Sequence, residues 1–240
     1  MPREFRAELE GNSDFDNFKG KVSGDLGLHI LQMHFGRTSE QVELLANNIA
    51  RVVFESANLL GLDPNSISLE SMMPDASRLT QLHGKKAEPI GGASEEGVVI
   101  PITSLLNWSR GGFLSNLELA STLAHETHHV ANNRRFQNYH ERLKDKKRTL
   151  ISSIRDESIA PSEKKQLQSE FRTVDTSSYS EIAAQLFARE YIENYYLPSV
   201  ETKKDRRLSA FLSMVDFSLD FFNKRMSRTY LSLIGKPLTV

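Results

Sequence analysis

Residues 115–130 of this chain read SNLELASTLAHETHHV. The apolar residues of this stretch recur at helical spacing from Leu117 to Val130, which predicts an amphipathic helix. Ser115 is followed three positions later by Glu118, the pattern of a capping box, so we expect the helix to begin close to Ser115. The second half of the predicted helix is rich in histidine, and it contains the candidate functional residues.

The histidine-rich half contains the pattern H-E-x-x-H, formed by His125, Glu126 and His129. Residues four apart lie on one face of a helix, so the imidazoles of His125 and His129 can bind one metal ion. Glu126 lies next to the first ligand, where its carboxylate can act as a general base on a metal-activated water. His128 is also a helical neighbour of His125, but the four-residue pair is the better-attested zinc spacing, which places His128 at the rim. The pattern therefore predicts a catalytic zinc site, and the alternative is an incidental polar helix face.

With this motif the chain resembles the zincin metallopeptidases. The metzincin branch continues with a glycine and a third histidine, and residues 130–136 contain neither. The gluzincin branch takes a glutamate from a second helix, and residues 179–188, YSEIAAQLFA, are similar to such a helix. The resemblance implies that Glu181 is the third metal ligand. The small residues Ala184 and Ala188 share its face and would allow the two helices to pack closely.

Other interpretations of this second helix remain open. Glu181 would also complete a capping box with Ser178, in which case it has a purely structural role. Four further residues are alternative third ligands: His140, Glu190, Glu193 and Asp175.

The resemblance to zincins implies a zinc-dependent endopeptidase that hydrolyses peptide bonds with a metal-activated water. Glu126 would take the proton of that water during attack on the carbonyl and pass it to the leaving amine. Many zincins add a Tyr or His side chain that donates a hydrogen bond to the oxyanion. Tyr179 is the expected catalytic residue of this kind, with His128 and His140 as alternatives, and a buried structural role is the alternative for Tyr179.

The expected fold is α+β, a mainly helical zincin-like domain with a small sheet. Thr38 and Gln41 form a second capping box, which opens a helix that ends at Gly61. A β-type run at Gly97–Ile102 contains Pro101, which has no N–H for a strand ladder, so we predict an edge strand just before the metal helix. The resemblance implies that an extended protein or peptide substrate pairs with this edge. The alternative is an ordinary sheet margin.

The domain organisation follows from composition, since 240 residues with 39% hydrophobic and 25% charged residues suit one good-sized domain. Residues 1–24 are polar and contain several glycines, which predicts a loose N-terminal arm. We expect residues 25–240 to form a single catalytic domain. Residues 134–172 hold 11 basic and 6 acidic residues. We expect two charged helices divided near Ala160-Pro161, as an insertion at about 134–174 that either selects a substrate with an acidic surface or is simply solvated.

Composition also limits the partners and the compartment. With a formal net charge of −1, the protein as a whole does not attract polyanions electrostatically. We therefore expect neither nucleic acid nor an anionic membrane as a partner. Cysteine is absent, which excludes disulfides, thiol catalysis and cysteine-ligated zinc, so a Zn²⁺ ion must be bound by histidine and carboxylate. The charged start, residues 1–10, lacks the apolar segment of a secretory signal. We expect a monomer. Its expected location is the cytoplasm, or a host cell reached by secretion that does not depend on a signal peptide.

Two narrower resemblances follow. The size and the charged insertion are similar to those of bacterial effector metalloproteases, which cleave host proteins, whereas Glu181 and the three residues Ala184, Phe187 and Ala188 after it resemble small cytosolic metallopeptidases that cleave repressors. The competing interpretation from another class is a non-catalytic, zinc-stabilised helical protein that binds partners through its basic helices.

Overall fold

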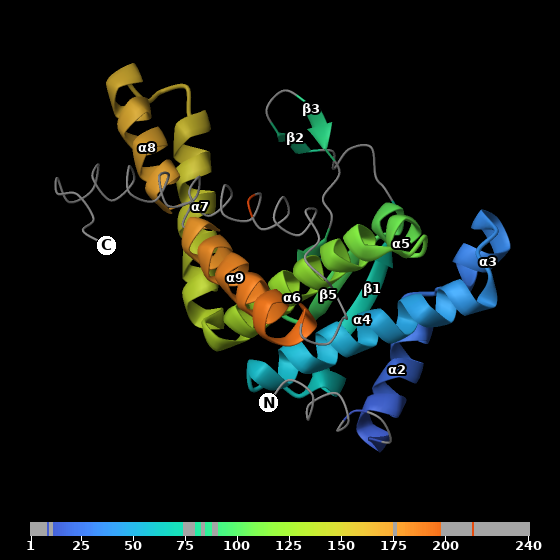
Figure 1. The fold of residues 1–240 in the computed structure, drawn as a ribbon. Coiled ribbons are helices and arrows are strands. Elements are labelled where there is room, and N and C mark those ends of the chain that lie inside the picture. The colour runs from blue at the N-terminus through green and yellow to red at the C-terminus, as the bar shows by residue number, and fades with distance from the viewer. Residues whose placement is uncertain are drawn as a thin grey trace.

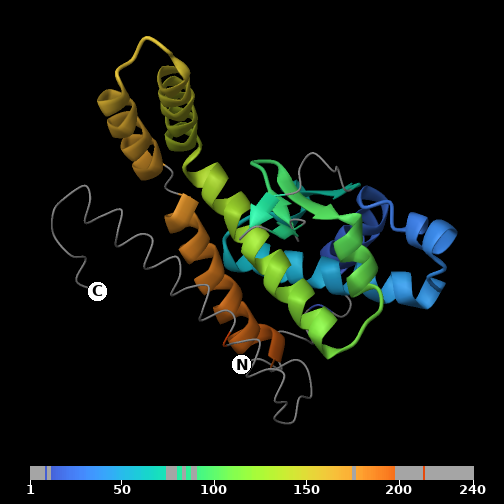
Figure 2. The same ribbon diagram turned by 90° about the horizontal axis from the view of Figure 1, so that it is seen from above.

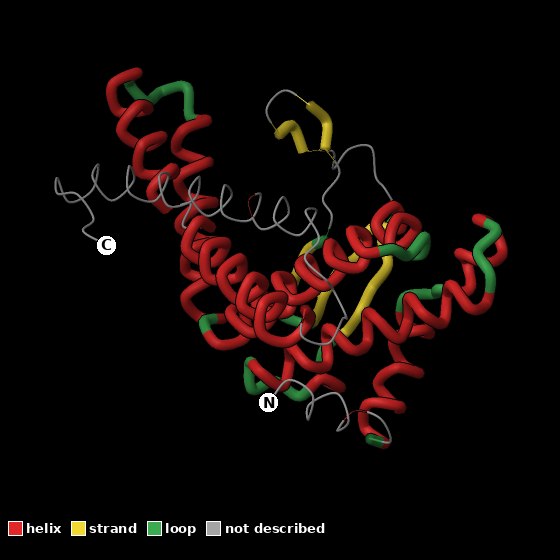
Figure 3. The backbone as a smooth tube through the Cα atoms, in the orientation of Figure 1, coloured by secondary structure: helices red, strands yellow, loops and turns green. Residues whose placement is uncertain are grey.

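The structure is a computed structural model that describes residues 9, 12–73, 80–82, 85–87, 91–174, 177–197 and 213. The described part is α+β, mostly helical with a small three-stranded sheet (Figure 1 and Figure 3), as expected. The elements in chain order are α2 (Ser13–Asp25), α3 (His29–Phe35), α4 (Ser39–Leu59), the 3-10 turn η1 (Pro64–Ser66), β1 (Ser68–Met72), β2 (Thr80–Leu82), β3 (Lys85–Ala87), β4 (Gly92–Ala93), β5 (Gly97–Pro101), α5 (Ile102–Trp108), α6 (Phe113–Arg135), α7 (Gln137–Arg155), α8 (Pro161–Val174), α9 (Ser177–Tyr191) and the π-helical turn η3 (Ile192–Tyr196).

Helix α6 lies at the centre of the molecule, in contact with α4, α5, α9 and strands β4 and β5. Figure 1 and Figure 2 both show α9 running alongside it. Its buried positions are mainly leucine and small residues, and both Ala120 and Ala124 are fully buried. Small side chains allow neighbouring backbones to approach closely. On α9, Ala184 and Ala188 are also fully buried, in agreement with the close packing expected there.

The predicted edge strand is wrong, because β5 is the central strand of the three-stranded sheet, whose order is β1-β5-β4. It pairs in parallel with β1 and antiparallel with β4. Pro101 ends the strand, and there its missing N–H does not interrupt the pairing of the residues before it. Gly97 lies opposite Ser68 in β1, and a Cβ at this position would collide with the Ser68 carbonyl oxygen. Only glycine allows the two strands to approach this closely.

The expectation of a loose arm at residues 1–24 is wrong for the part that the structure describes. Asn12 caps helix α2, since its side chain accepts hydrogen bonds from the N–H groups of Asp14 and Phe15. The helix then buries Phe15, Phe18 and Val22 against the core. Three apolar residues at helical spacing among many polar ones are enough to dock a short helix onto α4.

The two predicted capping boxes have opposite outcomes. The box at Thr38 and Gln41 is confirmed, with reciprocal side-chain bonds to the backbone at the start of α4. The box at Ser115 is wrong, because α6 already begins at Phe113 and has no side-chain cap. The preceding residues Gly111 and Gly112 have φ angles of 70° and 97°, and this glycine turn between α5 and α6 sets the start of the helix.

Helices α7 and α8 form the two charged helices predicted for residues 134–174, and α8 begins at Pro161 as expected. The two helices pack on each other, and in Figure 1 and Figure 2 the pair projects away from the sheet. They connect α6 to α9 in the sequence. The hairpin therefore separates two helices that lie side by side in the core.

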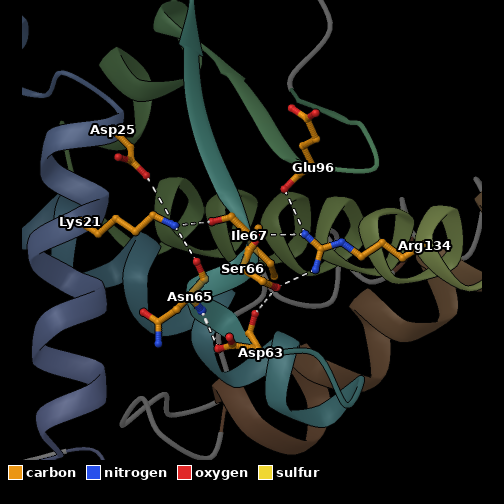
Figure 4. Close-up of polar contacts among 8 residues, drawn as sticks. All are labelled: Lys21, Asp25, Asp63, Asn65, Ser66, Ile67, Glu96 and Arg134. Atoms are coloured by element: carbon orange, nitrogen blue, oxygen red, sulfur yellow. Dashed lines mark hydrogen bonds and ion pairs between the residues drawn. The ribbon is translucent and has the colours of Figure 1, made fainter.

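Two basic residues secure the connection between η1 and β1 (Figure 4). Lys21 of α2 donates to the carbonyl oxygens of Asn65 and Ile67 at 2.9 and 3.1 Å. On the opposite side Arg134 of α6 donates to the Ser66 hydroxyl and carbonyl oxygens at 2.7 and 2.8 Å. The same guanidinium donates to the carbonyl oxygens of Glu95 and Glu96 between β4 and β5. Arg134 therefore connects the C-terminal part of the central helix to the end of the sheet at which the parallel strands β1 and β5 begin.

We expect Arg134→Lys to lower the free energy of unfolding by about 1–2 kcal/mol, since lysine keeps the charge but cannot present the planar fork of donors. Urea unfolding measures the difference. The matched control is Arg135→Lys, one residue along the same helix, which should stay near the parent value. Equal stabilities for the two variants would show that the network contributes little.

A buried polar pair joins α4 to α9. The Tyr191 hydroxyl donates to Glu55 Oε2 at 2.6 Å, and Arg51 Nε donates to Glu55 Oε1 at 2.8 Å. Tyr191 and Glu55 are each 1% exposed. Burial raises the pKa of Tyr191 well above its usual value of 10.0, and the negative charge of Glu55 acts in the same direction. The folded protein therefore holds Tyr191 protonated at a pH where the unfolded chain ionises it.

Because the pKa is raised on folding, this contribution to stability is complete below pH 10 and is lost as the pH rises above it. We expect Tyr191→Phe to cost about 1–3 kcal/mol at neutral pH, since one oxygen of a buried carboxylate loses its donor. The variant should also lose less stability than the parent above pH 10. Urea unfolding across this range tests both points, and parallel pH profiles would contradict the second.

Among the described residues, no helix combines the length and the apolar character needed to cross a lipid bilayer.

Candidate metal centre

Helices α6 and α9 bring the three predicted ligands together. His125 Nε2 and His129 Nε2 lie 3.0 Å apart on one face of α6. Glu181 of α9 reaches both, with Oε2 at 3.3 Å from His125 Nε2 and Oε1 at 3.3 Å from His129 Nε2. These ligand atoms all lie within 4.8 Å of one another, and they form the one such group of His and acidic side chains in the described part of the chain.

The spacing of these atoms fits a tetrahedral metal ion. Zinc binds imidazole nitrogen and carboxylate oxygen at about 2.0–2.1 Å, which at tetrahedral angles separates neighbouring ligand atoms by about 3.3 Å. The two Nε2 atoms lie 3.0 Å apart, and each lies 3.3 Å from a different oxygen of the Glu181 carboxylate, close to this separation. Two nitrogens and one carboxylate also match the ligand set of catalytic zinc sites, which leave a fourth position for water or substrate. The residues therefore fit a zinc ion in chemistry and in distance.

The charges of the cluster favour a bound cation. Burial alone would raise the pKa of Glu181, but hydrogen bonds with His125 and His129 lower it to about 2. Burial lowers the pKa of His129, and the hydrogen bond and negative charge of Glu181 more than compensate, so the net change is upward. Both changes have one cause, a carboxylate held against two imidazoles. A metal ion in this position would replace the shared proton.

Glu126 lies beside the cluster without being part of it. Burial raises the pKa of its carboxyl group, although the nearby His125 and His129 partly lower it. Gly91, just before β4, packs against this residue, since a Cβ on Gly91 would lie 3.2 Å from Glu126 Cγ and 3.0 Å from Thr122 Cγ2. Glu126 therefore places a second carboxylate next to the three convergent side chains. A general base for a metal-activated water would need such a position.

His128 points to a different neighbour. Its ring lies 5.5 Å from that of Phe187 on α9, and the pKa of the imidazole is lowered to about 4, first by burial and then by the charges of His129 and His125. His128 does not belong to the convergent group. The four-residue spacing of His125 and His129, rather than the three-residue spacing, is the pair that converges.

The other candidates from the sequence have separate outcomes. Glu190 is exposed on α9, and Glu193 accepts a hydrogen bond from Arg189 at 3.2 Å, so neither joins the cluster. Asp175 lies outside the described residues, as do the side chains of His140, Ser178 and Tyr179. The oxyanion donor therefore stays a prediction.

Sequence patterns did not point to the polar contacts behind His129. Its Nδ1 atom lies 2.9 Å from Ser180 Oγ, which also accepts a hydrogen bond from Asn132 Nδ2 at 3.0 Å. In contrast, His125 Nδ1 is buried and makes no hydrogen bond with the described residues. The position of Ser180 directly before a candidate ligand is the one signal that would have directed attention to it.

Comparison of this chain with models of protein families, with curated proteins and with solved structures finds no match.

Proposed function

We propose that this protein is a zinc-dependent endopeptidase of zincin-like fold, with His125, His129 and Glu181 as metal ligands and Glu126 as general base. The observation that carries the proposal is the convergence of two imidazole nitrogens and one carboxylate at 3.0–3.3 Å. Three protein ligands are typical of a catalytic zinc, since a structural zinc usually has four. The additional carboxylate of Glu126, beside the cluster and outside it, favours catalysis.

Zinc in such a site supplies Lewis acidity, which lowers the pKa of water towards neutrality and polarises a carbonyl group. The chain supplies the proton transfer. The Glu126 carboxylate accepts the proton of the attacking water and then donates it to the nitrogen of the leaving amine. The side chains of His125, His129 and Glu181 hold the reaction centre in place and are not consumed.

The substrate is proposed to bind along β4 rather than β5. Within the described sheet β4 has a neighbour on one side only, so its other edge offers unpaired backbone groups to an extended peptide. Gly91, the residue immediately before β4, lies against Thr122 and Glu126 of α6. A peptide added to this edge would pass next to the general base, as hydrolysis requires.

Gly91→Ala is expected to lower the turnover number by up to about 10-fold, because a displacement near 1 Å of a catalytic group costs about 100-fold and the shift needed here is a few tenths of an ångström. The new methyl group would lie 3.0 Å from Thr122 Cγ2 and 3.2 Å from Glu126 Cγ, so Glu126 must shift. Zinc content should not change. The control is Gly20→Ala in α2, far from β4 in the sequence, since a Cβ at Gly20 meets nothing within 4 Å. Equal rates for the two variants would contradict the proposed placement of Glu126.

The test of the proposed function uses untagged, full-length protein and a library of peptides derived from a cell lysate. New peptide termini are identified by mass spectrometry for the protein as purified, after removal of metal with a chelator, and after addition of zinc. Cleavage that disappears with the metal and returns with zinc supports the proposal. A protein that holds zinc and produces no metal-dependent termini from any library overturns it, and then the zinc-stabilised binding protein is the better explanation.

A further inference from the structure

Three polar side chains connect α6 and α9 directly behind the candidate metal cluster. Asn132 Nδ2 of α6 donates to Ser180 Oγ of α9 at 3.0 Å, and the same oxygen lies 2.9 Å from His129 Nδ1. All three side chains are partly buried. Ser180 is the residue immediately before Glu181, so one turn of α9 contacts His129 at both ring nitrogens.

The direction of these hydrogen bonds follows from the role of His129. Its Nε2 atom faces His125 Nε2 and Glu181 Oε1 at 3.0 and 3.3 Å, so Nε2 is the nitrogen that offers its lone pair to a metal. The ring proton must then be on Nδ1, which donates to Ser180 Oγ. A hydroxyl oxygen has two lone pairs. One accepts from Asn132 and the other is free for His129, so both bonds are compatible.

We propose that Ser180 is the positioning residue that holds His129 in its metal-binding tautomer and ring orientation, and that Asn132 acts by fixing the Ser180 hydroxyl. This inference rests on the metal site of the proposed function. Of the two histidines in that site, His129 alone has a partner for its second ring nitrogen among the described residues, since His125 Nδ1 makes no such bond. The orientation of the site therefore depends strongly on Ser180.

A consequence is that metal affinity depends on how α9 docks on α6. The first turns of α9 supply both a ligand, Glu181, and the acceptor that orients a ligand of the other helix, Ser180. A shift of α9 by one residue would remove both together. Ala184 and Ala188 further along α9 are fully buried, and helices α6 and α9 pack on each other.

The test measures zinc affinity by competition with a chromophoric chelator. Hydrogen-bond partners of ligating histidines contribute about 10–100-fold to metal affinity. We expect Ser180→Ala to weaken zinc binding by about 10–100-fold, and Ser180→Thr, which keeps the hydroxyl, to bind close to the parent value. Alanine is the best helix former, so the first substitution should not weaken α9 itself. Urea unfolding of the metal-free variants checks this point.

Asn132 is tested through a double-mutant cycle. Asn132→Ala should weaken zinc binding less than Ser180→Ala, and the double variant should be no weaker than Ser180→Ala alone, because Asn132 acts through the serine. The matched control is Asn133→Ala. Asn133 is the adjacent residue of α6 and lies about 100° away around the helix, so its replacement should leave the affinity unchanged.

A readout independent of affinity is the nitrogen spectrum of the imidazoles in zinc-loaded protein. Zinc on Nε2 keeps the proton of His129 on Nδ1 in every variant, so the signal to compare is the hydrogen bond of that N–H: its proton should exchange slowly with water in the parent and faster in Ser180→Ala. If Ser180→Ala binds zinc as tightly as Asn133→Ala, the positioning role is overturned while the metal site stands. If the parent protein binds no zinc, the proposed function fails, and this inference with it.

Discussion

Replacing Glu126 with glutamine is expected to reduce peptide hydrolysis by about 10²–10⁴-fold, the usual contribution of general acid–base catalysis. Zinc content and stability should stay at the parent values. Glutamine has the size and shape of glutamate but cannot accept the proton of the attacking water. Glu126 lies outside the group formed by His125, His129 and Glu181, so its replacement leaves all three ligands in place.

The measurement is the initial rate on a peptide that the parent cleaves, together with zinc content by elemental analysis. Glu118→Gln is the matched control, because Glu118 is another partly buried carboxylate of α6, with a pKa that burial raises in the same direction. It should cleave at the parent rate. Hydrolysis by Glu126→Gln at the parent rate would remove Glu126 from the mechanism, and a loss in both variants would point to a general effect on the helix.

This substitution also separates the two classes of function. In a zinc-stabilised binding protein Glu126 has no part in metal binding, so its replacement changes neither folding nor partner affinity. In an endopeptidase the same replacement removes turnover alone. The comparison of activity with metal content therefore distinguishes the two explanations in a single protein.

Replacing Glu181 with alanine is expected to weaken zinc binding by at least about 100-fold, more than the loss of a hydrogen-bond partner behind a ligand. Glu181 supplies both carboxylate contacts of the cluster, at 3.3 Å to His125 Nε2 and 3.3 Å to His129 Nε2. Without it two neutral imidazoles remain, and they offer no charge to balance a dication. Hydrolysis should disappear at zinc concentrations that saturate the parent.

Glu190→Ala is the control for this prediction. Glu190 belongs to the same helix and is exposed, and by sequence alone it is an alternative ligand. We expect it to bind zinc as the parent does. Competition with a chelator measures both variants under identical conditions. Full zinc affinity in Glu181→Ala would show that the third ligand lies elsewhere, and His140 and Asp175 would be the next residues to replace.

Two local features of the sequence were predicted correctly, the histidine spacing and the capping box at Thr38, whereas the capping box at Ser115 was not, because a glycine turn starts α6 at Phe113. The four-residue spacing of His125 and His129 places both rings on one side of α6, and the structure keeps their Nε2 atoms 3.0 Å apart. The capping box at Thr38 depends on residues three positions apart, and it is present. Helix geometry links such positions directly once the start of the helix is known, and at α6 that start depends on the preceding Gly111 and Gly112.

Features that depend on segments distant in the sequence were predicted less accurately. The proline of β5 suggested an edge strand, but the strand is central because β1 and β4 pair on either side of it. The polar start of the chain suggested a loose arm, but α2 buries Phe15 and Phe18 in the core. A strand's place in a sheet and a helix's docking depend on surfaces contributed by other segments. The residues of one segment do not contain that information.

The sequence by itself determined the relative positions of His125, Glu126 and His129, because a helical repeat fixes the positions of residues that lie within a few places of one another. Glu181 was nominated by resemblance to a family, and only the tertiary structure brings it against the histidines of α6. The hydrogen bond between His129 and Ser180 joins residues 51 positions apart and was decided by tertiary structure alone. The physical reason is that the packing of α9 on α6 depends on the whole buried core, including Ala184 and Ala188, whereas the spacing within α6 depends only on the helix itself.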